Sequence, residues 1–272
     1  MKTKQFLLTS IFVCVLASCT SSIPSEEYMK MNLKGHIKTI KESRYDVDYI
    51  NKEVVNKRNR HYTTYEFDKK GYLLCEILYD LDCENEFMRE QYELSHDTLY
   101  KRKYYSGKLQ DELECKIIDS KGLITSSFNL NNGKVSSLRT YEYNRQNKTA
   151  KITNWDNDGF ISSIEKFIYD KNGYLERIVS CNEDGDSLWT VYSYMNDENG
   201  RHLKTRLQLN PNGYPRFFTK RYNEFGDITY DGADWWEWKY KYTYDNHNNW
   251  ITQLRKGENN KYQYTEREYI YY

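Results

Sequence analysis

The sequence predicts an all-β fold: an up-and-down antiparallel meander of repeated hairpins, curled into an elongated, solenoid-like or barrel-like body. Three observations predict it. One turn motif recurs along the chain, apolar and polar residues alternate between its copies, and the composition suits strands. The 272 residues include 28 tyrosines but only three prolines, and aromatic residues fit a pleated, half-buried surface better than a helix.

The recurring motif is Asp or Asn, two further residues, and then Gly or Asn. A side-chain acceptor at the first position and a residue that tolerates positive φ at the fourth are typical of a type I turn. Between the copies, Trp236–Tyr244 alternates five aromatic with four polar residues, which indicates a strand. The copies are Asp68–Gly71, Asp119–Gly122, Asn144–Asn147, Asp156–Gly159, Asp170–Gly173, Asn182–Gly185, Asp197–Gly200, Asn210–Gly213, Asn223–Gly226 and Asp245–Asn248.

The spacing of the turns sets the length and number of the strands. From Gly122 to Gly226 the turn-closing residues recur every 11 to 15 residues, which leaves roughly nine residues, or about 30 Å, for each strand. The whole chain then holds on the order of fifteen strands, and open twisted sheets rarely exceed about ten without curling. We therefore expect each strand to pair with its neighbours in sequence, in a sheet that curls.

Several segments resemble the YD repeats of the RHS family. They are Phe67–Leu73, Tyr169–Leu175 and Tyr244–Ile251, and Leu33–Glu42 is similar to the first strand of small Bacteroidetes lipoproteins built from such repeats. The resemblance covers roughly residues 33–272, although 80–115 keep strand character and lose the signature. It implies a β-repeat fold and a cell-envelope setting, but no activity.

The first residues predict export and a lipid anchor. Lys2 and Lys4 precede an apolar stretch, residues 6–16, that is too short to span a bilayer. Leu16-Ala17-Ser18-Cys19 resembles the bacterial lipobox, in which the chain is cut before an acylated cysteine. We therefore expect a signal peptide at 1–18, lipid attachment at Cys19, a tether at 19–32 and the repeat domain at 33–272. Thr20 stands where Asp would retain a lipoprotein at the inner membrane, so an outer-membrane location is favoured, with surface or periplasmic exposure open.

Composition and motifs exclude several classes of function. Forty basic residues balance forty acidic ones, so the chain lacks the positive charge that nucleic-acid binding requires. The five histidines are scattered, and the sequence holds no nucleophile elbow and no phosphate-binding loop. With so many carboxylates, no pair can be singled out for glycoside hydrolysis. We expect a protein that is not an enzyme and needs no cofactor.

One segment mimics a metal site. Asn154–Glu165 matches the EF-hand calcium loop at the third, fifth, sixth and twelfth positions. Its flanks are strand-like and the turn motif at Asp156–Gly159 accounts for it, so we expect a hairpin turn and no metal. The mature cysteines, Cys75, Cys83, Cys115 and Cys181, can form two disulfides in three pairings or remain thiols.

An aromatic cluster near the end of the chain is the best candidate for binding. Four of the six tryptophans lie between residues 235 and 250. Aromatic platforms suit sugar stacking and protein hot spots, whereas a buried cluster is core. We expect a non-catalytic binding or scaffold role toward an envelope protein; the alternative is a glycan-binding or glycan-processing accessory lipoprotein. The candidate residues are Trp235, Trp236, Trp238, Tyr240 and Trp250.

Overall fold

The computed structural model describes residues 31–80, 85–146, 148–182, 187–196, 202–209, 216–233 and 235–272. This part of the chain contains eighteen strands and one short 3₁₀ helix, η1 (Glu258–Asn260). Within it, no helix is long and apolar enough to cross a membrane. The strands are β1 (Ile37–Ile50), β2 (Glu53–Phe67), β3 (Leu73–Tyr79), β4 (Glu86–Ser95), β5 (Thr98–Tyr105), β6 (Lys108–Ile118), β7 (Ile124–Asn131), β8 (Lys134–Tyr143), β9 (Thr149–Trp155), β10 (Ile161–Tyr169), β11 (Leu175–Asn182), β12 (Ser187–Asn196), β13 (His202–Leu209), β14 (Arg216–Tyr222), β15 (Ile228–Ala233), β16 (Trp236–Tyr244), β17 (Trp250–Lys256) and β18 (Tyr262–Tyr271).

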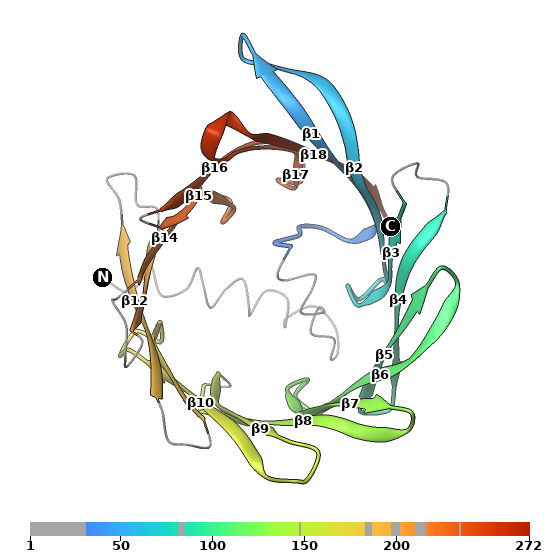
Figure 1. Cartoon of the computed structure of the whole chain (residues 1–272), viewed down its shortest axis with the longest axis vertical. Helices are drawn as coiled ribbons and strands as arrows, with labels where there is room; N and C mark the ends of the chain where they lie inside the picture. Colours follow the sequence, from blue (N-terminus) through green and yellow to red (C-terminus); the bar gives the residue numbers. More distant parts are fainter. Residues whose placement is uncertain are drawn as a thin grey trace.

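Every strand pairs antiparallel with its neighbours in sequence, so the predicted meander is confirmed. In addition, β1 pairs with β18 from Ile37↔Tyr271 to Val47↔Tyr262. The first strand is therefore bonded to both the second and the last, and the series of pairings returns to its start. Figure 1 shows the resulting ring of strands. This arrangement leaves the sheet without an unpaired edge strand.

The recurring motif of Asp or Asn, two residues, and Gly or Asn forms Asx turns wherever the structure describes it, as the sequence predicts. In the first one, Asp68 Oδ1 accepts hydrogen bonds from the backbone N–H groups of Lys70 (2.8 Å) and Tyr72 (2.9 Å), and the Gly71 N–H bonds to the Asp68 carbonyl (3.0 Å). Gly71 has φ +83°, a conformation that glycine adopts without a Cβ clash. The turns that begin at Asp119, Asp156, Asp170, Asn223 and Asp245 repeat this pattern; those predicted at 144–147, 182–185, 197–200 and 210–213 extend outside the described residues.

Three further hairpins close through two-residue turns that lack the motif. Both central residues have positive φ at Asn51-Lys52, Ser106-Gly107 and Asn132-Gly133. This is the geometry of a type I′ turn, whose twist matches that of the flanking strands. Ser106-Gly107 lies in the segment 80–115 where the motif disappears, and the strands continue there because a different turn replaces it.

Tyrosines tie adjacent strands together next to the turns. In each case a phenol donates a hydrogen bond to the carbonyl of the first residue of the preceding strand, at 2.7 to 2.9 Å. The contact recurs between β8 and β7, β10 and β9, β16 and β15, and β18 and β17. The donors are Tyr143, Tyr169, Tyr242 and Tyr269, and the acceptors are Ile124, Thr149, Ile228 and Trp250. This repeated bond is one structural role for the abundant tyrosines.

The ring has two distinct ends. Connections from even-numbered to odd-numbered strands lie at one end, together with the start of β1 and the end of β18. We call this the terminal end. Connections from odd-numbered to even-numbered strands lie at the opposite end, which we call the far end. Among the Asx turns that the structure describes, the one at Asp156 lies at the far end and the others lie at the terminal end.

The main hydrophobic cluster lies near the terminal end. Its buried members are Leu33, Ile37, Ile40, Tyr65, Phe67 and Leu73, with Met31, Tyr92, Tyr269 and Tyr271 packed against them. Residues 31–36 lie inside the outline of the ring in Figure 1, where they are the first coloured segment. The face of β1 that carries Ile37 and Ile40 is therefore the inner face of the sheet.

Hydrogen bonds hold the segment before β1 across the terminal end. Asn32 Nδ2 donates to the Phe225 carbonyl (2.7 Å). The Lys34 backbone N–H donates to Asn249 Oδ1 (2.7 Å), and Asn249 Nδ2 returns a bond to the Lys34 carbonyl (2.8 Å). Met31 and Asn32, which the sequence assigns to the tether, thus contact the ring, whereas residues 19–30 lie outside the described part of the chain.

Candidate functional site on the inner face of the ring

Strand β16 presents a continuous aromatic row. Its alternation places Trp236, Trp238, Tyr240, Tyr242 and Tyr244 on one face, all partly buried, whereas the intervening polar residues are exposed. Tyr240 and Tyr242 stack, with ring centroids 6.4 Å apart and an interplanar angle of 9°. Trp250 of β17 lies beside the row, 6.0 Å from Tyr242. We call these six side chains the aromatic wall.

The strand registers place the wall on the inner face. Residues directly opposite each other in an antiparallel pair project to the same side of a sheet. Tyr242 is opposite Gln253, and Gln253 is opposite Thr265. Thr265 and Tyr269 are four residues apart in β18, so their side chains share a face, and Tyr269 packs against the inner hydrophobic cluster. The wall therefore faces the interior of the ring, on the β15–β17 side in Figure 1.

Two guanidinium groups stack on the wall. Arg255 lies 3.5 Å from the ring centroid of Trp238 and 5.7 Å from that of Tyr240. Arg267 lies 3.7 Å from the ring centroid of Trp250. A cation over an aromatic face is attracted by the quadrupole of the ring, and this attraction is stronger at desolvated sites. The wall thus combines π faces with fixed positive charge.

A buried ion cluster holds Arg267 in place. Glu42 of β1 is 1% exposed. Its two carboxylate oxygens contact separate arginines, Oε1 with Arg44 and Oε2 with Arg267, each at 2.7 Å. Burial alone would raise the pKa of Glu42, but the charges and hydrogen bonds of Arg267 and Arg44 hold it below its ordinary value. Glu42 is therefore a carboxylate, and it fixes the guanidinium that stacks on Trp250.

Polar contacts fix the hydroxyl side of the wall. The Tyr242 hydroxyl donates to the Ile228 carbonyl (2.7 Å) and accepts from Gln253 Nε2 (3.2 Å). Burial raises the pKa of both Tyr242 and Tyr240, so both phenols are protonated at neutral pH. The wall consequently offers neutral aromatic rings with oriented hydroxyl groups.

The candidate residues from the sequence do not all belong to the wall. Trp236, Trp238, Tyr240 and Trp250 share it, as the alternation predicts. Trp235 precedes β16 at the far end of the ring, is 52% exposed and makes an edge contact with Phe218 at 5.9 Å. Its position outside the alternating strand separates it from the other four.

Sequence reasoning missed the residues that lie across the strands from the wall. Arg255 is opposite Tyr240, and Asp231 is opposite Trp238 and forms an ion pair with Lys220 at 3.4 Å. Neither belongs to a motif. Only the register identifies them, and the register of a neighbouring strand is not visible in the alternation of a single strand.

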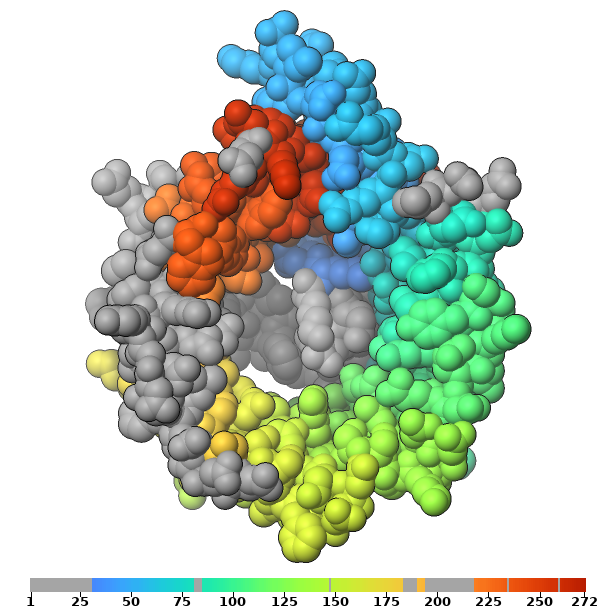
Figure 2. Space-filling model, viewed as in Figure 1, coloured from blue at the N-terminus to red at the C-terminus, as the bar shows by residue number. Residues whose placement is uncertain are grey.

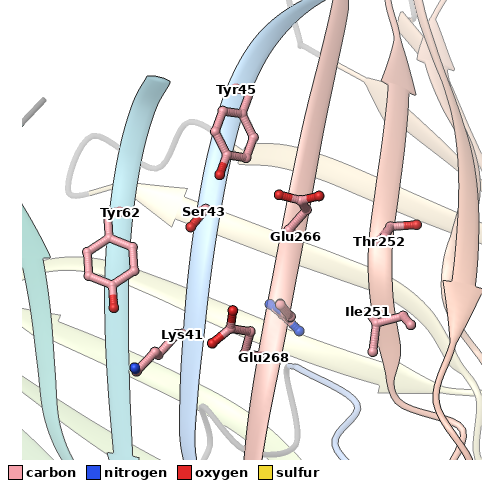
Figure 3. A pocket seen from close by; sticks show the side chains of 9 residues that line it. Lys41, Ser43, Tyr45, Tyr62, Ile251, Thr252, Glu266 and Glu268 are labelled. Carbon is pink, nitrogen blue, oxygen red and sulfur yellow. The ribbon is translucent and has the colours of Figure 1, made fainter. Parts of the chain in front are cut away.

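A hollow lies on the outer face of the sheet, opposite the face that carries the aromatic wall, where β17, β18, β1 and β2 run side by side (Figure 3). It encloses about 520 Å³. Lys57, farther along the β1–β2 hairpin, pairs with Glu266 at 2.6 Å and lies 4.7 Å from the Tyr264 ring centroid. Charges of both signs thus meet on an open surface, and we assign it no chemistry. The hollow is lined by Lys41, Ser43, Tyr45, Tyr62, Ile251, Thr252, Glu266 and Glu268, and Arg267 also borders it although its guanidinium lies on the inner face against Trp250.

The segment that mimics a calcium loop is a hairpin. Asp156 Oδ1 accepts hydrogen bonds from the backbone N–H groups of Asp158 (3.0 Å) and Phe160 (2.8 Å), and strands β9 and β10 flank the turn where an EF-hand would have helices. In the described residues, no group of three or more His, Cys, Asp and Glu side chains could hold a metal ion. Cys75 and Cys115 are thiols in the structure, whereas Cys19 and Cys83 lie outside the described residues.

Comparisons with known proteins give distant likenesses. No protein-family model and no curated protein matches the chain. A porin-like protein from Bacteroides uniformis is similar in structure, with a TM-score of 0.46 and 13% identity, over 88% of this chain and 98% of that one. The Photorhabdus luminescens Tc holotoxin pore gives a TM-score of 0.32 and 11% identity over 80% and 14%. A TcdB2-TccC3-Cdc42 structure gives 0.28 and 10% over 81% and 15%.

Proposed function

We propose that this chain is a lipid-anchored cell-envelope protein that binds a partner on the aromatic wall inside its ring, in a non-catalytic role. The aromatic wall with its stacked arginines carries the proposal, because such groups recognise ligands by stacking and hydrogen bonding. The lipobox at Cys19 and the likeness to YD-repeat lipoproteins support the envelope setting. An outer-membrane location, on either side of that membrane, belongs to the same proposal.

The composition of the wall favours recognition over turnover. Trp236 and Trp238 present indole rings, and Arg255 presents a guanidinium beside them. Arg and Trp are enriched among the residues that dominate protein interfaces. The ion pair between Lys220 and Asp231 at the edge of the wall adds polar groups that could fix the orientation of a partner.

The second candidate function is glycan binding. The apolar face of a sugar ring stacks on an indole, while hydroxyl groups bond to charged and amide side chains. Trp238 has Arg255 on its ring and Asp231 opposite it in the next strand. This combination favours a glycan over a purely apolar ligand. A role as an accessory in glycan processing would follow from such binding.

The test compares wall variants with a control on the same strand. Trp236→Ala and Trp238→Ala remove aromatic faces from the interior, whereas Lys239→Ala alters the opposite face of β16. Acylated full-length protein would be screened against a glycan array and against envelope extracts by cross-linking and mass spectrometry. We expect the wall variants to lose a ligand that the Lys239→Ala protein retains, with circular dichroism confirming that both fold. Ligand capture unchanged in both tryptophan variants would refute the wall as the binding surface.

The lipid anchor has its own test. Palmitate labelling should disappear in a Cys19→Ala variant, and unchanged labelling would contradict the anchor. Digestion of the domain by protease added to intact cells would indicate exposure at the cell surface. Protection until the outer membrane is broken would indicate the periplasm.

A further inference from the structure

Exposed apolar side chains gather at the far end of the ring. The described residues include twelve exposed large hydrophobic side chains, and eight of them lie at or next to far-end hairpin connections. They come from six separate hairpins distributed around the ring. We call them the apolar rim: Ile50 (55% exposed), Phe87 (52%), Tyr105 (42%), Leu109 (57%), Val135 (48%), Phe160 (70%), Ile161 (41%) and Trp235 (52%).

The turn geometry does not require this exposure. Phe160 directly follows the glycine of the Asp156 turn and is 70% exposed. At the terminal end the same position of the same turn holds Tyr72, Tyr174 and Asn249, which are partly or fully buried. Hairpin tips in water normally carry polar residues. The difference therefore belongs to the far end of the ring and not to the turn motif.

Lysines accompany the apolar residues at three of the six rim hairpins. Each far-end type I′ turn carries an exposed lysine within two residues of a rim side chain. The pairs are Ile50 with Lys52, Leu109 with Lys108, and Val135 with Lys134. Apolar side chains flanked by lysine suit the boundary of an anionic bilayer, where the first enter the acyl region and the second meet phosphate groups. The other three tips lack this lysine: Asp158 is exposed beside Phe160, Glu86 precedes Phe87, and Glu237 lies two residues after Trp235.

We propose that the apolar rim docks on a lipid surface. The rim consists of separate projections around a ring, a shape that fits a broad, deformable layer better than the compact surface of a globular partner. A membrane is also within reach if Cys19 is acylated, and in that respect the inference rests on the proposed anchor. The twelve residues 19–30 span roughly 40 Å when extended, more than the ~30 Å length of a nine-residue strand.

The experiment maps lipid contact directly. Acylated full-length protein is reconstituted into vesicles of phosphatidylcholine and phosphatidylglycerol that contain a phospholipid with a photoactivatable diazirine on its acyl chain. After flotation and irradiation, mass spectrometry locates the adducts. We expect them at Tyr105–Leu109, Val135 and Phe160–Ile161, and not at the exposed apolar residues of the terminal end, which are Leu74, Leu94, Ile270 and Tyr272.

Matched variants test whether the rim acts as a unit. Leu109→Ser with Val135→Ser should lower the adduct yield at Phe160 by at least about threefold, because less apolar area remains to hold the rim in the bilayer. Leu74→Ser with Leu94→Ser, at the opposite end, should leave that yield unchanged. Adducts at the terminal end, adducts spread evenly, or a floated protein without adducts would each overturn the proposal. So would end-to-end dimers cross-linked through rim residues.

The experiments distinguish a failure of the rim proposal from a failure of the proposed lipid anchor. Palmitate labelling reports only on Cys19, and the adduct map reports only on the domain. An acylated, floating protein whose adducts lie at the terminal end would retain the anchor and refute the rim. Rim adducts on a protein that incorporates no palmitate would refute the anchor and support the rim.

Discussion

Replacing Arg267 by Met should be among the most destabilising single changes in this ring. The side chain of Arg267 is 8% exposed, and its Nε and Nη2 atoms each lie 2.7 Å from Glu42 Oε2. Methionine keeps much of the length and flexibility of arginine but removes the charge and both hydrogen bonds. The buried Glu42 carboxylate would then retain only Arg44, whose side chain is 53% exposed.

The expected loss in unfolding free energy follows from the Glu42 carboxylate, which remains buried. Removing one partner of a buried ion pair typically costs about 3–5 kcal/mol, because the other charge is left desolvated without full compensation. The lost stacking of Arg267 on Trp250, at 3.7 Å, adds to this. For a domain of this size a loss of 1 kcal/mol lowers Tm by about 2–4 °C, so we expect a decrease on the order of 10 °C. Arg44→Met should cost only about 1 kcal/mol, as for a largely solvated ion pair.

Differential scanning calorimetry and urea unfolding followed by circular dichroism would measure both variants. The expected order is Arg267→Met far below Arg44→Met, which lies just below the unaltered protein. Equal losses in the two variants, or a loss below about 1 kcal/mol for Arg267→Met, would refute the reasoning, because a buried charge deprived of its main partner must cost more than a solvated one.

The same cluster predicts how stability depends on pH. The folded-state pKa of Glu42 is lowered, so the carboxylate contributes stability that is fully present above its unfolded pKa of about 4.3 and is lost as pH falls through the folded value. Unfolding free energy should therefore fall below about pH 4 in the unaltered protein. A Glu42→Gln protein should show a weaker fall over the same range. Identical acid profiles would mean that other carboxylates dominate.

Three further predictions concern single groups. In Gly257→Ala the new Cβ would clash with the Trp238 ring, so we expect a change in tryptophan fluorescence and a loss of about 1–3 kcal/mol as for overpacking; an unchanged spectrum would contradict the close approach. Tyr242→Phe removes the 2.7 Å bond to the Ile228 carbonyl and should cost about 1–2 kcal/mol by urea unfolding, whereas no change would mean that water replaces the phenol. Burial raises the pKa of Cys75 to about 11, so peptide mapping at pH 8 should find it alkylated more slowly by iodoacetamide than an unperturbed thiol; equal rates would refute the burial.

The fold was largely predictable because its signals are local. An Asx turn needs only four residues, and Asp68–Gly71 forms the bonds that those residue types predict. Pairing of successive strands then follows from the short connections. The pairing of β1 with β18 has no local signal, since Ile37 and Tyr271 lie at opposite ends of the sequence. The strand number was underestimated for a related reason: turns such as Ser106-Gly107 follow different chemistry from the repeated motif.

The candidate site was predictable only along a single strand. Alternation places Trp236, Trp238 and Tyr240 on one face, and the structure confirms it. Which residues lie across from them depends on register, and a shift of one position would exchange the inner and outer faces. Arg255 and Arg267 could therefore not be assigned to the wall before the pairing was known.

Closure of the sheet limits where a partner could bind. A closed sheet has no edge strand to which a partner could add, so recognition must use a face or an end. Inside the ring, the β4–β6 side carries a charge ladder in which Lys101 bonds to Glu90 at 2.7 Å and approaches Glu114 at 3.7 Å. The aromatic wall lies on the opposite side (Figure 1), and Figure 2 shows the hollow between the two sides. A ligand on the wall would thus stack on aromatic rings and face charged groups across the interior, an environment that suits a polar molecule with an apolar face. If such a ligand binds, removing the charge of Lys101 should weaken it less than removing Trp238, because the distant charges act through water whereas the indole is in contact.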